Sequence, residues 1–205
     1  MIHAEPLELE RDFLGCENCP EILSATRPDV IRNIHRKYLE AGADIVETNT
    51  FGGTKIVLAE FGIADRAHEL NVASVRLARE AAAEFSTPHK PRFVAASIGP
   101  TTKASITLTG GAPFRQLEEN YFEQAKSLIE GEADLLLIET AQDTRNIKAA
   151  LLGVERAKQA LGVDVPVMLS VTIERQGAML AGQPIDALWA SVSHANLFSV
   201  GLNCA

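Results

Sequence analysis

In residues 134–140, Asp134-Leu135-Leu136-Leu137-Ile138-Glu139-Thr140, an unbroken apolar run follows the aspartate and ends abruptly in two polar side chains. A half-exposed strand would alternate polar and apolar residues, so this run predicts a strand buried on both faces of a parallel sheet. Comparable candidate strands occupy residues 44–48, 92–98, 165–173 and 198–204. Segments of helical period separate them, at 64–85, 113–131, 143–161 and 184–194. The repeated strand and helix therefore predict an α/β fold built on a parallel sheet.

A further helix is expected before the first strand. Thr26-Arg27-Pro28-Asp29 offers a capping residue, a proline where a missing N–H does no harm, and an acidic residue in the first turn. Gly42 is well placed to end this helix, because glycine tolerates a left-handed backbone. Gly131 and Gly162 are expected to end two later helices in the same way.

Polar residues follow the apolar runs at their carboxyl ends, which favours a barrel over a doubly wound sheet. Catalytic groups of an eight-stranded barrel come from the carboxyl ends of several strands. Doubly wound sheets usually carry a glycine-rich phosphate loop, and neither Gly-x-Gly-x-x-Gly nor a Walker loop occurs here. Five strands in 205 residues fall short of the roughly 250 residues typical of the complete fold. We therefore predict a partial (β/α)8 TIM barrel with about five of its eight strands, comprising an irregular segment at 1–26 and an incomplete barrel at 27–205.

Composition narrows the classes of partner. The chain is 46% hydrophobic and 22% charged, with 19 basic against 27 acidic residues and a net charge of −8. No cluster of Lys and Arg is present that could follow a phosphate backbone or an anionic membrane, so neither nucleic acid nor a membrane is an expected partner. The first residues do not have the pattern of a signal peptide, and no apolar run reaches the roughly 20 residues that span a bilayer. We expect a cytoplasmic protein.

Three cysteines without a secretion signal argue against a disulfide framework. Cys16 and Cys19 have the Cys-x-x-Cys spacing of a metal or redox pair, but no second such pair accompanies them. We expect both to be surface or half-buried thiols without a metal or redox role.

Several motifs resemble, in order from about Phe13 onward, those of the homocysteine S-methyltransferase family, and most closely its cobalamin-dependent methionine synthase branch. The motifs are Thr-Arg-Pro-Asp-Val-Ile at 26–31, Ala-Gly-Ala-Asp-Ile-Val-Glu-Thr-Asn-Thr-Phe-Gly at 41–52, Ser-Ile-Gly-Pro-Thr at 97–101, Asp-Leu-Leu-Leu-Ile-Glu-Thr at 134–140 and Gly-Leu-Asn-Cys-Ala at 201–205. The resemblance implies the homocysteine-binding barrel of that family, truncated at both ends.

The resemblance also implies zinc chemistry. In the family, three cysteine thiolates hold a zinc ion that binds the homocysteine sulfur, because a free thiol is mostly protonated at neutral pH and a zinc-bound thiol is not. Cys204 matches the first of these ligands and is the candidate catalytic and metal-binding residue. A small buried hydrophobe at a strand end is the alternative role for this residue. The adjacent Cys-Cys pair and the opening Asp-Gly-Ala-Met-Gly-Thr strand of the family are absent from this sequence.

Substrate-binding residues are implied at three strand ends. Glu139 would hold the homocysteine ammonium through a charge-assisted hydrogen bond, or alternatively cap the following loop. The residues that could receive the substrate carboxylate, or simply cap a loop, are Glu47, Thr48, Asn49 and Thr50. Asn203 would support the site beside Cys204, or serve in an ordinary turn.

The methyl donor implied by the resemblance is methylcobalamin on another domain, recharged on a folate-binding domain of the same longer chain. A homocysteine methyltransferase that uses betaine or S-methylmethionine, and a noncatalytic barrel fragment, are the alternatives. If the barrel interpretation holds, Glu47, Glu139 and Cys204 should lie at one end of a parallel sheet.

Overall fold

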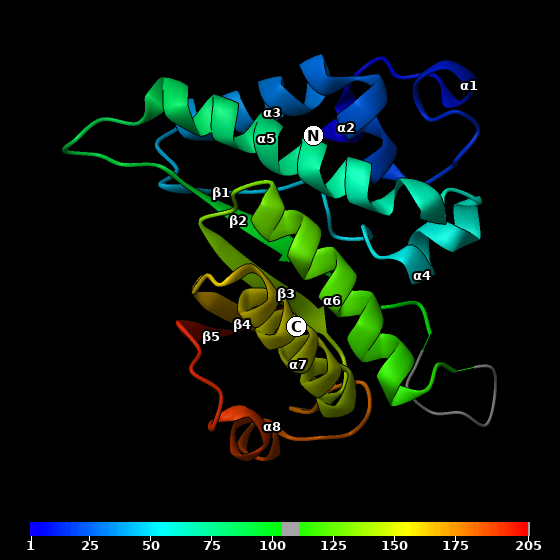
Figure 1. Cartoon of the computed structure of the whole chain (residues 1–205), viewed down its shortest axis with the longest axis vertical. Helices are drawn as coiled ribbons and strands as arrows, with labels where there is room; N and C mark the ends of the chain where they lie inside the picture. Colours follow the sequence, from blue (N-terminus) through cyan, green and yellow to red (C-terminus); the bar gives the residue numbers. More distant parts are fainter. Residues whose placement is uncertain (104–110, 205) are drawn as a thin grey trace.

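A computed structural model describes residues 1–103 and 111–204, and its centre is a five-stranded sheet in the order β1-β2-β3-β4-β5. Every neighbouring pair of strands is parallel (Figure 1). The strands are β1 (Ile45–Glu47), β2 (Phe93–Ile98), β3 (Leu135–Ala141), β4 (Val167–Thr172) and β5 (Ser199–Asn203). A doubly wound sheet reverses its strand order at a switch point, whereas this order follows the chain without reversal. The sheet is the curled wall of a half-barrel, which confirms the predicted fold class and the five predicted strands.

Long helices precede β1 and connect successive strands. They are α3 (Pro28–Glu40), α5 (Ala67–Phe85), α6 (Phe114–Glu130), α7 (Thr144–Leu161) and α8 (Ile185–Val192). Shorter helical segments are η1 (Ile2–Ala4), α1 (Leu9–Asp12), η2 (Pro20–Ile22), α2 (Leu23–Thr26), α4 (Lys55–Leu58), η3 (Ala59–Phe61) and η4 (Ala64–Arg66). The five long helices lie where sequence periodicity predicts them. In the described ranges no helix combines the length and apolar character needed to cross a membrane.

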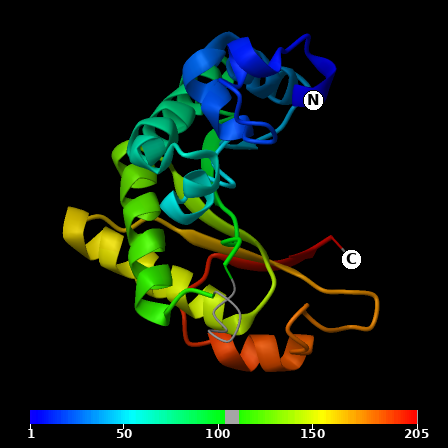
Figure 2. The ribbon, with the colours of Figure 1, turned by 90° about the vertical axis from the view of Figure 1, so that its right-hand side faces the viewer.

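The two faces of the sheet are both apolar in its middle. On the outer face, Leu136 and Ile138 are buried in the large core beneath the helices. On the inner face, Leu135 and Leu137 pack with Ala95 in a smaller cluster. Figure 2 shows the long helices gathered on one side of the strands. Because both faces exclude water, the central strand needs no polar alternation, which explains its continuous apolar sequence.

Two helix ends differ in detail from the sequence expectation. Thr26 is not the cap of α3: its hydroxyl donates to the carbonyl oxygens of Asp12 and Ile22, and the residue at the N-cap, Arg27, makes no side-chain capping bond. The hydroxyl is used instead to close α2, so Pro28 begins α3 without a capping side chain. At the end of α6, Gly131 keeps a right-handed backbone. The left-handed position follows at Glu132, with φ of 70°.

The glycines after α3 and α7 behave as predicted. Gly42 follows α3 with φ of 106°, and Gly162 ends α7 with φ of 66°. Both angles lie in the region that favours glycine, because a Cβ would crowd the following carbonyl.

The amino-terminal segment packs against helices α3 and α5. Ile22 and Leu23 are fully buried and share a core with Ile31 of α3 and Leu70 of α5. Residues 1–26 contain short helical turns and no strand, and the division of the chain at residue 26 stays a prediction.

The cysteines of this segment correct one expectation. Cys16 and Cys19 are buried in the same core, with exposed fractions of 8% and 0%, rather than lying at the surface or half-buried. Neither forms a disulfide. Short helical turns around the two cysteines direct the thiols into the core, and the irregular sequence pattern does not predict these turns.

Gly153 sets the closest approach of α7 to α6. A Cβ at this position would lie 2.7 Å from the carbonyl oxygen of Glu118, 2.7 Å from the amide nitrogen of Phe122 and 2.9 Å from the Cβ of Tyr121. These neighbours belong to the backbone and first side-chain atom of α6, so they cannot move aside without moving the helix. Glycine therefore permits the helix contact that covers the middle of the sheet.

We predict that Gly153→Ala lowers the free energy of unfolding by about 1–2 kcal/mol, because an overpacking cost of ~1–3 kcal/mol exceeds the helix-propensity gain of ~1 kcal/mol. Urea unfolding followed by circular dichroism measures the change. Leu152→Ala is the matched control, since Leu152 is 49% exposed on the same helix. A Gly153→Ala protein as stable as the parent would show that the helix contact is not tight.

Candidate active site at the carboxyl edge of the sheet

The candidate residues on β1, β3 and β5 lie toward one edge of the sheet. Glu47 is the last residue of β1, Glu139 stands near the end of β3, and Cys204 directly follows β5. All five strands run in the same direction, so these positions belong to its carboxyl edge. The arrangement agrees with the expected placement of the three residues.

The carboxylates of Glu47 and Glu139 lie close enough at this edge for their charges to interact. Glu139 is half-buried and accepts a hydrogen bond from the hydroxyl of Ser97 on β2. Glu47 keeps contact with solvent, but partial burial raises the pKa of its carboxyl, and the negative charge of Glu139 raises it further. Within the described ranges neither carboxylate has a recorded ion pair. Two uncompensated carboxylates make a local negative potential that suits a cationic ligand group.

The threonines after β1 are used inside the fold. The hydroxyls of Thr48 and Thr50 are 2.6 Å apart, and both residues are buried. The amide of Ser97 donates to the Thr48 hydroxyl over 3.1 Å, and the Thr50 hydroxyl donates to the Ser97 carbonyl oxygen over 2.7 Å. These bonds fasten the loop after β1 to β2, so neither hydroxyl is left free for a ligand.

Asn49 turns in the opposite direction, toward the amino-terminal segment. Its side-chain amide donates to the carbonyl oxygen of Pro20 over 2.7 Å and lies 3.4 Å from the Ser24 hydroxyl. Its backbone amide donates to the Ser74 hydroxyl over 2.8 Å. Its recorded side-chain contacts thus tie the loop to residues 20–24.

Glu21 is a buried carboxylate beside the loop after β1 that sequence reasoning missed. It is buried, and its carboxylate accepts a hydrogen bond from the backbone amide of Gly52 over 2.7 Å. Burial raises the pKa of this carboxyl. The sequence does contain one indication: Glu21 is followed by the apolar residues Ile22 and Leu23. A glutamate buried next to such residues needs a hydrogen-bond partner.

The end of β5 is linked to the end of β3. The side-chain amide of Asn203 donates to the Thr140 hydroxyl over 2.8 Å and lies 3.5 Å from the sulfur of Cys204. Thr140 and Cys204 both have left-handed backbones, with φ of 56° and 55°, and the β3 to β4 register shifts between Ile138 and Ala141. The irregular backbone lets the two strand ends meet across β4, and the Cys204 side chain is exposed there.

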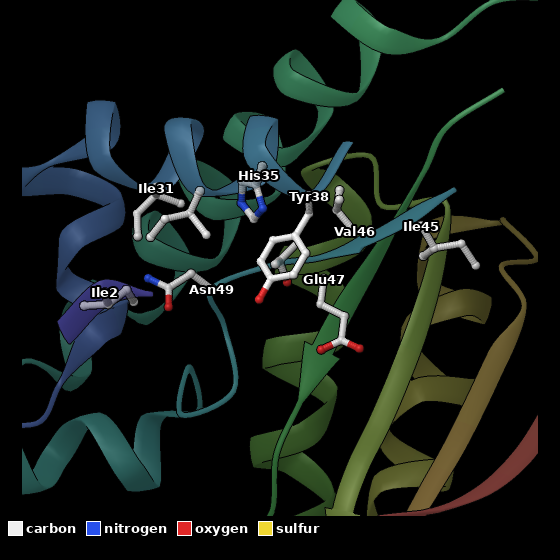
Figure 3. Close-up of a pocket in the computed structure, with 10 residues that line it drawn as sticks. Ile2, Ile31, His35, Tyr38, Ile45, Val46, Glu47 and Asn49 are labelled. Atoms are coloured by element: carbon white, nitrogen blue, oxygen red, sulfur yellow. The ribbon is translucent and has the colours of Figure 1, made fainter. Parts of the chain in front are cut away.

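A cavity of about 480 Å³ adjoins this edge between α3 and β1. Figure 3 shows His35 and Tyr38 on α3 near Val46, Glu47 and Asn49. His35 is 5% exposed, and its Nε2 atom has no hydrogen-bond partner in the described part of the chain. Burial lowers the pKa of His35 to about 4, so this imidazole is neutral at pH 7.

A metal site is not assembled by these side chains alone. Among the described residues no group of three His, Cys, Asp or Glu side chains is arranged to hold a metal ion. Cys204 supplies one thiol at the carboxyl edge, and the other two cysteines lie in the amino-terminal core. Zinc sites need three or four protein ligands, so the described residues do not by themselves fit a zinc ion.

Comparison with known proteins relates the whole chain to one family. A sequence profile of the homocysteine S-methyltransferase family matches residues 1–205. Methionine synthase of Mycobacterium leprae is 44% identical over 194 residues, which cover 95% of this chain and 16% of that protein. Methionine synthase of Mycobacterium tuberculosis is 43% identical over 204 residues, covering 100% of this chain and 17% of that protein. The chain thus spans about one sixth of the length of these relatives.

The fold has a solved counterpart. The homocysteine methyltransferase MmuM from Escherichia coli, in its oxidized form, superposes with a TM-score of 0.78 and 21% sequence identity. The match covers 99% of this chain and 70% of that chain. At this identity the likeness supports the barrel fold alone.

We predict that His35 makes stability fall as pH is lowered. Its folded-state pKa of about 4 lies below the unfolded value near 6.5, so between these values the unfolded chain binds the proton more readily. Relative to His35→Leu, the parent should lose on the order of 2–3 kcal/mol between about pH 7 and pH 4. Urea unfolding at several pH values measures this difference.

The matched control is His89→Leu, which removes an exposed histidine. An equal pH dependence of the difference in both variants would exclude burial of His35 as its cause.

Proposed function

Because the chain belongs to the homocysteine S-methyltransferase family, we propose that it forms the homocysteine-binding part of an enzyme that methylates the homocysteine sulfur to give methionine. The observation that carries the proposal is the pair of uncompensated carboxylates, Glu47 and Glu139, at the same sheet edge as Cys204. This chain covers 16% and 17% of the two methionine synthases, so the reaction is proposed for a longer protein. That protein, with the remaining strands of the barrel, is called the complete enzyme below.

Glu139 binds the homocysteine ammonium in this proposal. The Ser97 hydroxyl donates to one carboxylate oxygen of Glu139, which orients the group and leaves the other oxygen for a cationic ligand. Glu47 adds negative charge nearby and strengthens the attraction for the ammonium. The competing role for Glu139 is to cap the loop after β3, which would require no ligand.

The loop after β1 receives the homocysteine carboxylate in this proposal, through its main chain. Thr48 and Thr50 use their hydroxyls to bind β2, and the Asn49 amide binds Pro20. Their role is therefore to hold backbone N–H groups in place for an anion, which is a common use of loop amides. Simple capping of the loop is the alternative, and the Glu21 and Gly52 substitutions of the next subsection distinguish the two roles.

Cys204 is proposed as one zinc ligand of the complete enzyme, with the remaining thiolates supplied from outside these 205 residues. Zinc, when bound, keeps a coordinated thiol deprotonated and nucleophilic. Asn203 holds the strand end by donating to Thr140 and lies against the Cys204 sulfur. A hydrogen-bonded neighbour of this kind orients a metal ligand before the metal arrives.

Methylcobalamin on another domain is the proposed methyl donor, with a folate-binding domain of the same longer chain to recharge it. The similarity to two methionine synthases supports this choice. An enzyme using betaine or S-methylmethionine would share the barrel, and a noncatalytic barrel fragment would lack the reaction. Sequencing the coding region on both sides separates the first from the other two, because only the first has cobalamin- and folate-binding domains. We propose the cytoplasm as its location.

We predict that Cys204→Ser in the complete enzyme loses zinc and methyl transfer together, because a hydroxyl poorly replaces a thiolate. The 205-residue chain should bind zinc weakly and form no methionine, since one thiolate does not make a tetrahedral site. Metal analysis and a methionine-formation assay test both statements.

Cys16→Ala is the control, because it removes a thiol from the amino-terminal core. Stoichiometric zinc and turnover in the 205-residue chain, or full activity of Cys204→Ser, would contradict the assignment.

We predict that Glu139→Gln in the complete enzyme weakens homocysteine binding about 10- to 100-fold and leaves zinc affinity nearly unchanged. The substitution removes the charge while keeping size and an acceptor, so the charge-assisted contact is what is lost. Calorimetric titration with homocysteine and with zinc measures the two affinities separately.

Glu155→Gln, on the exposed face of α7, serves as the control. Unchanged homocysteine affinity in a folded Glu139→Gln protein would remove Glu139 from the substrate site.

A further inference from the structure

Glu21 of η2 is a buried carboxylate beside the loop after β1, with an exposed fraction of 5%. One of its oxygens, Oε1, accepts from the Gly52 backbone amide at 2.7 Å, and Oε2 lies 3.6 Å from the thiol of Cys19. No ion pair of Glu21 is recorded in the described part of the chain. Burying a carboxylate without a cation costs free energy of folding, so a structural or functional role of its contacts is needed to explain it.

Gly52 is shaped to receive this carboxylate. A Cβ added at Gly52 would lie 2.8 Å from Glu21 Oε1 and 3.2 Å from its Cδ. The Glu21 carboxyl group thus occupies the space in which any other residue would place its side chain. The hydrogen bond and the close approach together define where the main chain of the loop runs.

The same short helix holds the loop at a second point. Pro20, the residue before Glu21, accepts from the Asn49 side-chain amide at 2.7 Å. From the other side, Gln124 donates to the Thr50 carbonyl oxygen at 2.8 Å. The loop after β1 is therefore clamped between η2 and α6, with Glu21 as the ionisable member of the clamp.

We propose that Glu21 is a positioning residue for homocysteine: through Gly52 it fixes the loop that receives the substrate carboxylate. Glu21 itself does not touch the substrate. The inference rests on the proposed function, because that function assigns the loop after β1 to the carboxylate. It adds a residue of the amino-terminal segment to the machinery of substrate binding.

Kinetics of the complete enzyme test the proposal. Glu21→Ala removes the acceptor for the Gly52 amide and should raise KM for homocysteine about tenfold or more while changing kcat less than about threefold. Glu21→Gln keeps an oxygen in the same place and should restore KM to within about threefold of the parent. A residue that only stabilises the fold would lower the active fraction, and with it kcat, without a selective change in KM.

Asp12→Ala is the matched control. Asp12 is a 1% exposed carboxylate of the same segment that accepts from the Glu8 backbone amide at 2.8 Å. Its recorded partners lie outside the loop after β1. This variant should lose stability and keep the parental KM. If Glu21→Ala does not fold, Gly52→Ala, which intrudes on the carboxylate, should raise KM in its place.

A second readout separates the two proposals. Amide hydrogen exchange at Gly52 in the 205-residue chain should accelerate in Glu21→Ala and remain slow in Glu21→Gln. Faster exchange at Gly52 with an unchanged KM would overturn the positioning role and leave the proposed function standing. A complete enzyme that neither binds nor methylates homocysteine would overturn both, even if the exchange result shows the predicted bond.

Discussion

The parallel alignment of five strands, of which β2, β3 and β4 are largely excluded from water, is the constraint on which the rest of the structure depends. Backbone groups of these central strands bond to neighbours on both sides, so each central strand can be apolar on both faces until it reaches the edge. At the carboxyl edge the chain leaves the sheet, and polar side chains can lie there without the cost of full burial. Glu47, Glu139 and Cys204 consequently gather at one edge although they are separated by more than ninety and then sixty residues of chain.

The carboxyl edge carries negative charge that no positively charged side chain of the described residues neutralises, and this points to a ligand. Glu47 is affected by the charge of Glu139, and neither carboxylate has a recorded partner of opposite charge in the described ranges. Glu80, in contrast, is paired with Arg32. A fold gains nothing from two unpaired carboxylates side by side, so their proximity is better explained by a ligand than by stability. The same reasoning separates Glu139 from the buried threonines, whose bonds are satisfied internally.

The contacts of the amino-terminal segment change its interpretation. Its sequence has no periodic pattern, and it reads as an irregular segment before the barrel. In the structure it places Pro20 and Glu21 beside the loop after β1 and buries Ile22 and Leu23 against α3 and α5. Irregular sequence here reflects short helical turns held by long-range contacts, which local patterns cannot encode.

The sequence by itself determined the parallel α/β class, the five strands and the long helices, because burial on both faces and helical period leave direct marks on residue order. The roles of the candidate residues at the strand ends came from motifs that resemble those of one family. Only the tertiary structure decided how those candidates are used. It turned the Thr48 and Thr50 hydroxyls inward, joined Asn203 to Thr140 across β4, and placed Glu21 against Gly52. Each of these contacts joins residues far apart in the chain, and their pairing depends on how strands and segments pack in space. Such packing leaves no periodic pattern in the sequence from which it could be predicted.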